Sequence, residues 1–195
     1  AMLRSDSYRA TSIGAIVRDA DEGNNIISET FFQGEKGEEV ADYSYNYQLG
    51  TMTVKSTSVM FYEGEVDSGE VDGAGDPIMV PGRVRAIEAD SYIAAMVETD
   101  SYKDDARGVD ADGAEVIDGT KLQSTTFFYG EKGDEIADYT YNYKLGDRNT
   151  VRTVGVMIYD GTGTGRASTD TSVTSESAML RSDSYRATSI GAIVR

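Results

Sequence analysis

Polar and apolar side chains alternate along the segment ADYSYNYQL, which begins at residue 41 and returns as ADYTYNYKL at residue 137. Period-two alternation places every second side chain on the same face of an extended chain. Because aromatic residues favour strands, we predict a strand with one buried face in each copy. In the two copies that face carries Tyr43, Tyr45, Tyr47 and Leu49, and Tyr139, Tyr141, Tyr143 and Leu145.

Other apolar segments are bounded by glycine or by aspartate-rich turns, which is typical of strands. No segment keeps apolar residues at helical spacing over the roughly ten positions that a helix needs. We therefore predict an all-β fold of tandem antiparallel β-sandwich domains, immunoglobulin-like in the loose sense. The further predicted strands are residues 2–8, 10–17, 26–32, 52–62, 83–97, 122–128 and 151–159.

The chain begins and ends with the same eighteen residues, AMLRSDSYRATSIGAIVR. The second copy starts at Ala178, which lies 177 residues after Ala1. Chance does not produce such an identity, so 177 residues is the period of a repeat. The repeat arises by gene duplication, by deliberate duplication, or because the chain runs past one period of a longer array.

A second, older repeat lies inside this period. Residues 30–50 return as residues 126–146, and sixteen of the twenty-one positions are identical. The triplet Asp6-Ser7-Tyr8 is matched to Asp90-Ser91-Tyr92 and to Asp183-Ser184-Tyr185, so we expect two units per 177-residue repeat. The predicted domains are residues 1–82 and 83–166, followed by a Ser/Thr-rich linker at 167–177 and the first strands of the next repeat at 178–195. Pro77 and Pro81 are expected in the connector between the two units.

The composition excludes several classes of function. With 34 acidic and 18 basic residues the net charge is −16, so the chain repels nucleic-acid phosphates and anionic membrane surfaces. Cysteine, histidine and tryptophan are absent, which removes thiolate nucleophiles, imidazole bases and the usual zinc ligands. No apolar stretch reaches the length of a membrane span. We expect a non-enzymatic protein that is neither a nucleic-acid binder nor inserted in a membrane.

Two acidic loops are candidate calcium sites. Asp19 and Asp21, and Asp110 and Asp112, place carboxylates at alternate positions in glycine-bearing loops, as a cation with six to eight oxygen ligands requires. Neither loop continues to the glutamate that completes an EF-hand. The alternative interpretation is a pair of solvated acidic turns that keep the protein soluble.

The tyrosines suggest either a packed core or a binding surface. Tyrosine buries its ring and keeps its hydroxyl for a polar partner, so a row of them is suited to core packing, to a subunit interface or to a glycan platform. The first eighteen residues are candidates for strands that complete the sheet of a neighbour. The candidate interface residues are Tyr43, Tyr45, Tyr47, Tyr139, Tyr141, Tyr143, Tyr8, Ile13, Ile16 and Val17.

Together these patterns favour a structural protein. We expect an acidic, extracellular or cell-surface array that forms a filament, stalk or adhesin-like fibre, with copies of the chain joined head to tail or tandem copies in one long polypeptide. The alternative is a β-sandwich module that binds calcium or a glycan. An enzyme using an acid pair such as Glu39 and Glu135 is a more distant alternative.

Overall fold

The computed structural model describes residues 1–16 and 25–193, and in that part of the chain the fold is antiparallel β throughout. This confirms the all-β prediction. The strands are β1 (Arg4–Tyr8), β2 (Ile26–Gln33), β3 (Val40–Tyr47), β4 (Val54–Val71), β5 (Pro77–Arg85), β6 (Met96–Lys103), β7 (Arg107–Val109), β8 (Glu115–Ile117), β9 (Leu122–Tyr129), β10 (Ile136–Lys144), β11 (Asp147–Tyr159) and β12 (Met179–Tyr185). Three short 3-10 turns are η1 (Ile13–Ala15), η2 (Gly119–Lys121) and η3 (Ile190–Ala192).

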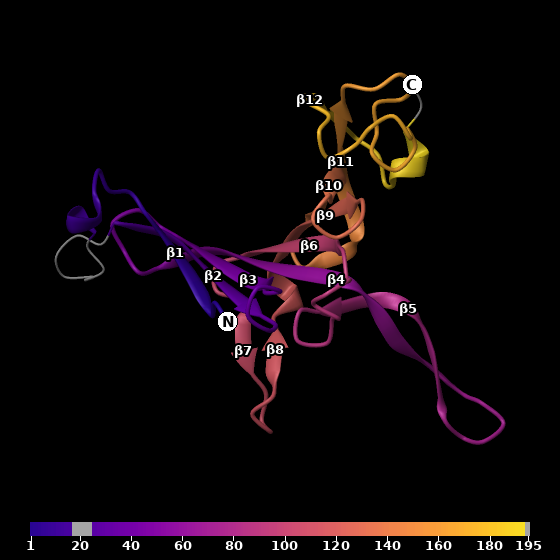
Figure 1. Ribbon diagram of the computed structural model, residues 1–195, viewed down its shortest axis with the longest axis horizontal. Coiled ribbons are helices and arrows are strands. Elements are labelled where there is room, and N and C mark those ends of the chain that lie inside the picture. The colour runs from indigo at the N-terminus through magenta and orange to yellow at the C-terminus, as the bar shows by residue number, and fades with distance from the viewer. Residues whose placement is uncertain (17–24, 194–195) are drawn as a thin grey trace.

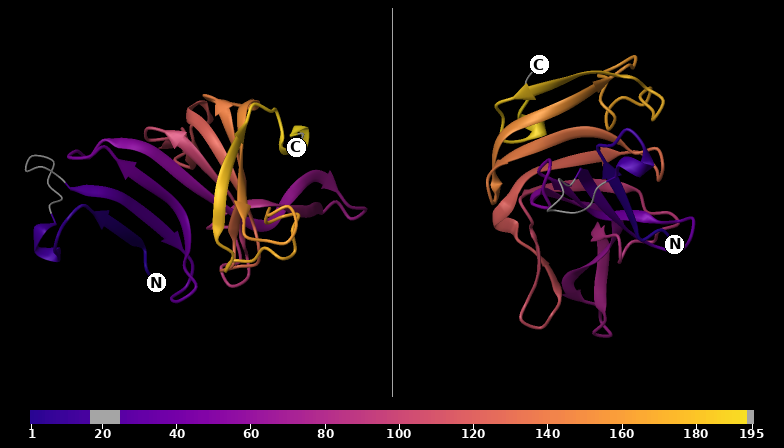
Figure 2. Two further views of the ribbon diagram at one scale, coloured as in Figure 1. Left: turned by 90° about the horizontal axis from the view of Figure 1, so that it is seen from above. Right: turned by 90° about the vertical axis from the view of Figure 1, so that its left-hand side faces the viewer.

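One continuous sheet contains ten of the described strands. Its order is β1-β2-β3-β4-β6-β9-β10-β11-β12, with β5 paired to β4 beside this path, while β7 and β8 form a separate hairpin. The sheet curves and twists from β1 at one end to β12 at the other (Figures 1 and 2). Each neighbouring pair is antiparallel. Most neighbours in the sheet are also consecutive in the chain.

The expected pair of immunoglobulin-like sandwiches is not confirmed, because strands of both predicted domains join this one sheet. The expected division after residue 82 falls inside β5. A sandwich buries one sheet face against a second sheet. Here the covering groups come instead from the β7–β8 hairpin and from loops, since Ala106 and Ile117 pack with Tyr43 and Val59.

A long arm replaces the connector that the prolines suggested. β4 pairs with β3 as far as Val59 and with β6 as far as Tyr62, and beyond Tyr62 its only partner among the described strands is β5. The arm extends away from the rest of the sheet (Figure 1). Pro77 and Pro81 lie within β5, which pairs with β4 alone among the described strands. Proline lacks an N–H and is tolerated on such an edge strand, so the two prolines mark an edge and not a linker.

Three further expectations need correction. Residues 10–17 were expected as a strand, and the described part of this segment contains the 3-10 turn η1. Residues 83–97 do not form one strand, because β5 ends at Arg85 and β6 begins at Met96. The Ser/Thr-rich segment 167–177 packs on the sheet through buried Ala167 and Val173. In residues 10–17 and 83–97, apolar residues suggested a strand although a turn lies within the segment. In residues 167–177, the polar composition suggested a linker although two of its apolar side chains are buried.

Both halves of the sheet use the same core contacts. The hydroxyl of Tyr62 donates to the carbonyl of Ala41 at 2.6 Å. Tyr159, which lies 97 residues later, donates to the carbonyl of Ala137 at 2.7 Å. Each half also has a buried carboxylate that is paired with an arginine. Asp42 of β3 pairs with Arg85, and Asp138 of β10 pairs with Arg166.

The loop before each tyrosine-bearing strand also repeats, between β2 and β3 and between β9 and β10. Gly34 and Gly130 adopt φ values of +112° and +130°, and an added Cβ at either would meet the carbonyl oxygen four residues later at 2.7 Å and 2.5 Å. Only glycine fits this conformation without strain. The GEKG turn is therefore a backbone requirement of each unit.

Candidate assembly interface

The structural repeat is a unit of four strands, which we call the four-strand unit. The first consists of β1, β2, β3 and the sheet part of β4, and the second of β6, β9, β10 and β11. β12 has the same sequence as β1 and therefore begins a third unit. Strand β6 is the junction between units, because it pairs with β4 on one side and β9 on the other.

The ladders around the first strand of each unit share one register. Asp6 of β1 lies opposite Glu29, and Asp100 of β6 lies opposite Thr125, which is 96 residues after Glu29. Both ladders also shift register immediately before the following tyrosine, Tyr8 or Tyr102. The unit therefore defines how its first strand joins its second.

The ladder to the preceding unit repeats as well. Asp100 of β6 lies opposite Val59, and Asp183 of β12 lies opposite Val156, which is 97 residues after Val59. Register shifts occur next to the equivalent tyrosines Tyr62 and Tyr159. The end of one unit therefore joins the next unit in the same way at β6 and at β12.

The structural match to Asp6-Ser7-Tyr8 is Asp100-Ser101-Tyr102, and not the triplet at Asp90. Asp90 to Tyr92 lie in the turn before β6, where the N–H of Tyr92 donates to the carboxylate of Asp90 at 3.0 Å. A signal for the correct match was present: a methionine stands four positions before the aspartate in all three strands, at Met2, Met96 and Met179.

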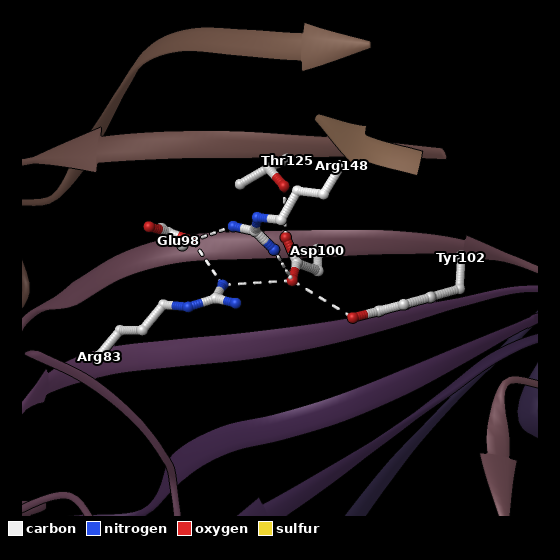
Figure 3. A network of polar contacts seen from close by, with 6 residues as sticks. All are labelled: Arg83, Glu98, Asp100, Tyr102, Thr125 and Arg148. Carbon is white, nitrogen blue, oxygen red and sulfur yellow. Dashed lines mark hydrogen bonds and ion pairs between the residues drawn. The ribbon is translucent and has the colours of Figure 1, made fainter. Parts of the chain in front are cut away.

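Buried charges hold the junction strand β6. Asp100 is fully buried and accepts hydrogen bonds from the Thr125 hydroxyl at 2.5 Å and the Tyr102 hydroxyl at 3.2 Å. Arg83 from β5 and Arg148 from β11 reach the same carboxylate at 3.2 Å and 2.8 Å (Figure 3).

Both arginines also contact Glu98, at 2.5 Å and 2.9 Å. The network therefore links β5 of the arm, the junction strand β6 and β11, the last strand of the second unit. Burial, followed by the negative charge of Asp100, raises the pKa of Tyr102. That tyrosine consequently serves this network as a neutral hydrogen-bond donor.

A glutamate anchors the start of the first strand in each unit. Glu135 accepts the N–H of Met96 at 3.0 Å and the N–H of Gly133 at 2.8 Å. Glu39, the equivalent residue, accepts the N–H of Met2 at 2.6 Å and the N–H of Gly37 at 3.0 Å. The Met2 N–H is the main cause of the lowered pKa of Glu39. Glu39 and Glu135, considered from the sequence as an acid pair, therefore occupy equivalent positions in two separate units. In each unit the carboxylate accepts hydrogen bonds from backbone N–H groups.

An ion pair joins the GEKG turns of the two units. The Nζ of Lys132 lies 2.7 Å from Glu38 Oε2 and donates to the carbonyl of Ser91 at 2.6 Å. Lys36 occupies the place of Lys132 in the first unit, and it is exposed and forms no ion pair within the described residues. No sequence motif marks this contact, since the partners lie 94 residues apart.

The predicted tyrosine faces form two rows of contacting rings. Phe31 stacks on Tyr43 with ring centres 4.4 Å apart, and Phe127 stacks on Tyr139 at 4.5 Å. The rows continue through Tyr45 and Tyr47, and through Tyr141 and Tyr143.

Each row is covered by the chain that follows the next unit's first strand. In the first unit, the guanidinium of Arg107, from β7, lies 3.4 Å from the ring centre of Tyr43. In the second unit, the N–H of Ile190, the first residue of η3, donates to the Tyr141 hydroxyl at 3.0 Å. Burial raises the pKa of Tyr43 and of Tyr45. Within a single chain these tyrosines act in packing, and their predicted role between chains stays a prediction.

The two identical terminal segments have different surroundings. Ile13 is 87% exposed, whereas Ile190, its counterpart, packs against Val154 and Val156. Tyr8 and Tyr185 are each half-buried and donate to the aspartate two residues before them. Ile16 is half-buried at the end of η1, and Val17 lies outside the described residues. The first copy of the segment pairs with β2, and the second copy covers the second unit.

The candidate calcium residues that the structure describes form a turn. The carboxylate of Asp110 accepts the N–H groups of Asp112 and Ala114 at 3.0 Å and 2.9 Å, which closes the β7–β8 hairpin. Asp19 and Asp21 lie outside the described residues. Among the residues that are described, no three acidic side chains gather as a group able to hold a metal ion.

Comparison of the chain with protein-family models, with curated proteins and with solved structures finds no match. Within the described residues, no helix has the length and apolar character needed to cross a membrane.

Proposed function

We propose that this chain is a structural repeat module of an extracellular filament, stalk or adhesin-like fibre, which assembles head to tail through the edges of its sheet. The single observation that carries the proposal is the placement of two identical strands, β1 and β12, at opposite ends of one continuous sheet. A surface that begins and ends on the same strand is suited to open-ended repetition.

The ends of the sheet support the same function. β1 pairs with β2 and β12 pairs with β11, and no other described strand pairs with either. An unpaired strand edge is a template for another strand unless it is covered. Association at one end leaves an equivalent end available, so the contact generates a line of copies and not a closed dimer.

The junction between the two units inside the chain also supports the proposal, because it shows how one unit joins the next. Ladders, an ion pair and the buried network around Asp100 already join two four-strand units within the chain. A further unit added at β12 extends the same architecture. The repeated part is therefore the four-strand unit, present twice in each 177-residue period.

Negative-stain electron microscopy of the purified chain over a range of protein concentrations tests this function. We expect unbranched filaments whose axial repeat corresponds to two four-strand units, together with a sedimentation coefficient that rises with concentration. Samples with calcium and with a chelator show whether the cation takes part. Compact single particles at every concentration, with and without calcium, would contradict the proposal.

A further inference from the structure

Resting on the proposed function, we infer that one copy of the eighteen-residue segment serves two successive repeats: β12 of one repeat occupies the β1 position of the next. The partner at the β2 edge is thus residues 178–185 of a second copy of this chain. In a long tandem polypeptide the same strand fills the same position covalently.

The junction at β6 contains the complete arrangement. There a single strand pairs with the last strand of one unit and with the second strand of the following unit. At the ends of the chain the two contacts are divided: β12 has the ladder to the preceding unit, and β1 has the ladder to the following unit. Because β1 and β12 are identical and keep the registers of β6, one strand satisfies both ladders.

Simple edge-to-edge contact between β12 and β1 does not give this junction. Each of these strands is antiparallel to its neighbour. With the two sheets facing the same way, β12 and β1 placed side by side run parallel, unlike any ladder in the described structure. Such contact also places two strands, β12 and β1, between successive units. At the internal junction a single strand, β6, lies between the units. Replacement of β1 by β12 keeps both the antiparallel order and the spacing.

Strand replacement sets the register between copies. From the β1–β2 ladder, Ser184 of one copy lies opposite Ser28 of the next, and Ser182 lies opposite Thr30. The N–H of Met179 takes the place of the Met2 N–H on Glu39.

A further contact forms only between copies. Lys132 of the second unit pairs with Glu38 of the unit before it, and the residue equivalent to Glu38 in the second unit is Asp134. Lys36 of one copy therefore reaches Asp134 of the preceding copy. In the single chain Asp134 accepts the hydroxyl of Ser175 at 2.6 Å, and Lys36 is exposed.

Cysteine pairs in the full 195-residue chain test the register, because the chain has no cysteine of its own. The variant S28C/S184C places two thiols opposite each other across copies, at the Cα separation of about 4.5–5.5 Å found in antiparallel pairs, which a disulfide spans. S28C/S182C is the off-register control. S7C/S28C is the locked control, because Ser7 lies opposite Ser28 within one chain and a disulfide there holds β1 in place.

Each variant is refolded at high concentration, oxidised, and examined on non-reducing gels and by electron microscopy. We expect S28C/S184C to form a ladder of covalent oligomers at least fivefold more abundant than that of S28C/S182C. The oxidised S7C/S28C chain stays monomeric and forms filaments after reduction.

The outcomes separate the two proposals. Filaments from the locked, oxidised chain, or equal ladders from the matched and off-register pairs, would overturn strand replacement and leave the fibre function standing. Chains that remain monomeric in all variants, locked and unlocked, would overturn the fibre function and this inference with it.

Discussion

The Nζ of Lys132 lies 2.7 Å from the carboxylate of Glu38, across the boundary between the two four-strand units. The same amine donates to the carbonyl of Ser91, so one side chain joins two turns. K132M removes both contacts, and we expect a loss of about 1 kcal/mol in the free energy of unfolding because the pair is partly exposed.

K36M is the matched control for K132M in urea unfolding, since Lys36 is exposed at the equivalent position. We expect K36M to leave monomer stability unchanged and to weaken association between copies. Equal destabilisation of the monomer by the two substitutions would show that the Lys132 contact adds nothing.

The carboxylate of Asp100 depends on its two arginines. Its side chain is 1% exposed, and Arg83 and Arg148 supply the compensating positive charge. R83M/R148M leaves a buried charge with hydroxyl partners only, so we expect a loss of about 3 kcal/mol in the free energy of unfolding. R152M, at an exposed arginine of the same strand β11, is the control and is expected to change stability by less than about 0.5 kcal/mol. Urea unfolding followed by circular dichroism measures both, and a double variant as stable as the parent contradicts the prediction.

Ile13 and Ile190 provide a matched comparison, because they occupy the same position in identical segments. I190A removes apolar contacts with Val154 and Val156, so we expect a loss of about 1 kcal/mol. I13A alters a side chain that is 87% exposed and should change stability by less than about 0.5 kcal/mol in the monomer. Thermal unfolding at low protein concentration distinguishes them, and equal midpoints would mean that η3 does not pack on the second unit.

We expect the loop that follows β11 to be sensitive to acid through Asp170. Hydrogen bonds from the Ser172 hydroxyl and from the N–H groups of Gly165 and Gly163 lower the pKa of Asp170 to about 2. A lowered pKa means that this contribution to stability is present above about pH 4, the unfolded value, and is lost as the pH falls through about 2.

Nuclear magnetic resonance of the Gly163 and Gly165 amides measures this titration directly. We expect both signals to shift with a midpoint near pH 2 in the parent chain and to lose that transition in D170N. D72N, which alters a similar turn at the tip of the β4–β5 arm, should leave it unchanged. A midpoint near pH 4 in the parent would show that the amides do not hold the carboxylate.

We expect the buried and half-buried tyrosines to make the fold sensitive to alkali. Burial, followed by the neighbouring Tyr141, raises the pKa of Tyr139 to about 12, and burial also raises the pKa of Tyr62. For an acid held neutral in the fold, this stabilisation is complete below about pH 10 and is lost as the pH rises through about 12.

Tyrosinate absorbance at 295 nm, recorded together with circular dichroism, tests this behaviour. We expect part of the tyrosine ionisation to coincide with the loss of β structure, and Y139F to reduce the amplitude of that part. Ionisation of all tyrosines near pH 10 without any change in the dichroism would contradict it.

Much of the local structure follows from the sequence alone. Alternation around Tyr43 and Tyr139 predicted β3 and β10, and the internal repeat predicted two copies of one unit. These features are local, because the alternation of side chains and the glycine turns depend on residues only a few positions apart. They can therefore be predicted from the sequence without the tertiary structure.

The tertiary structure alone decided which strands lie beside one another. The segments around Asp90 and Asp100 both contain Asp-Ser-Tyr, and the methionine four positions before Asp100 marks the second as the match to Asp6. The position of that strand between the two units follows only from its ladders to Val59 and Thr125. The prolines, read as a connector, lie on an edge strand because β5 has one partner.

The eighteen-residue duplication shows the same division. Sequence determined that residues 1–18 and 178–195 are identical, and therefore that the chain contains a repeat. Only the fold showed that one copy pairs with β2 while the other pairs with β11 and covers Tyr141. The physical reason is that a strand's local preference is set by its own residues, whereas its partners are set by burial and hydrogen bonding with segments distant in the chain.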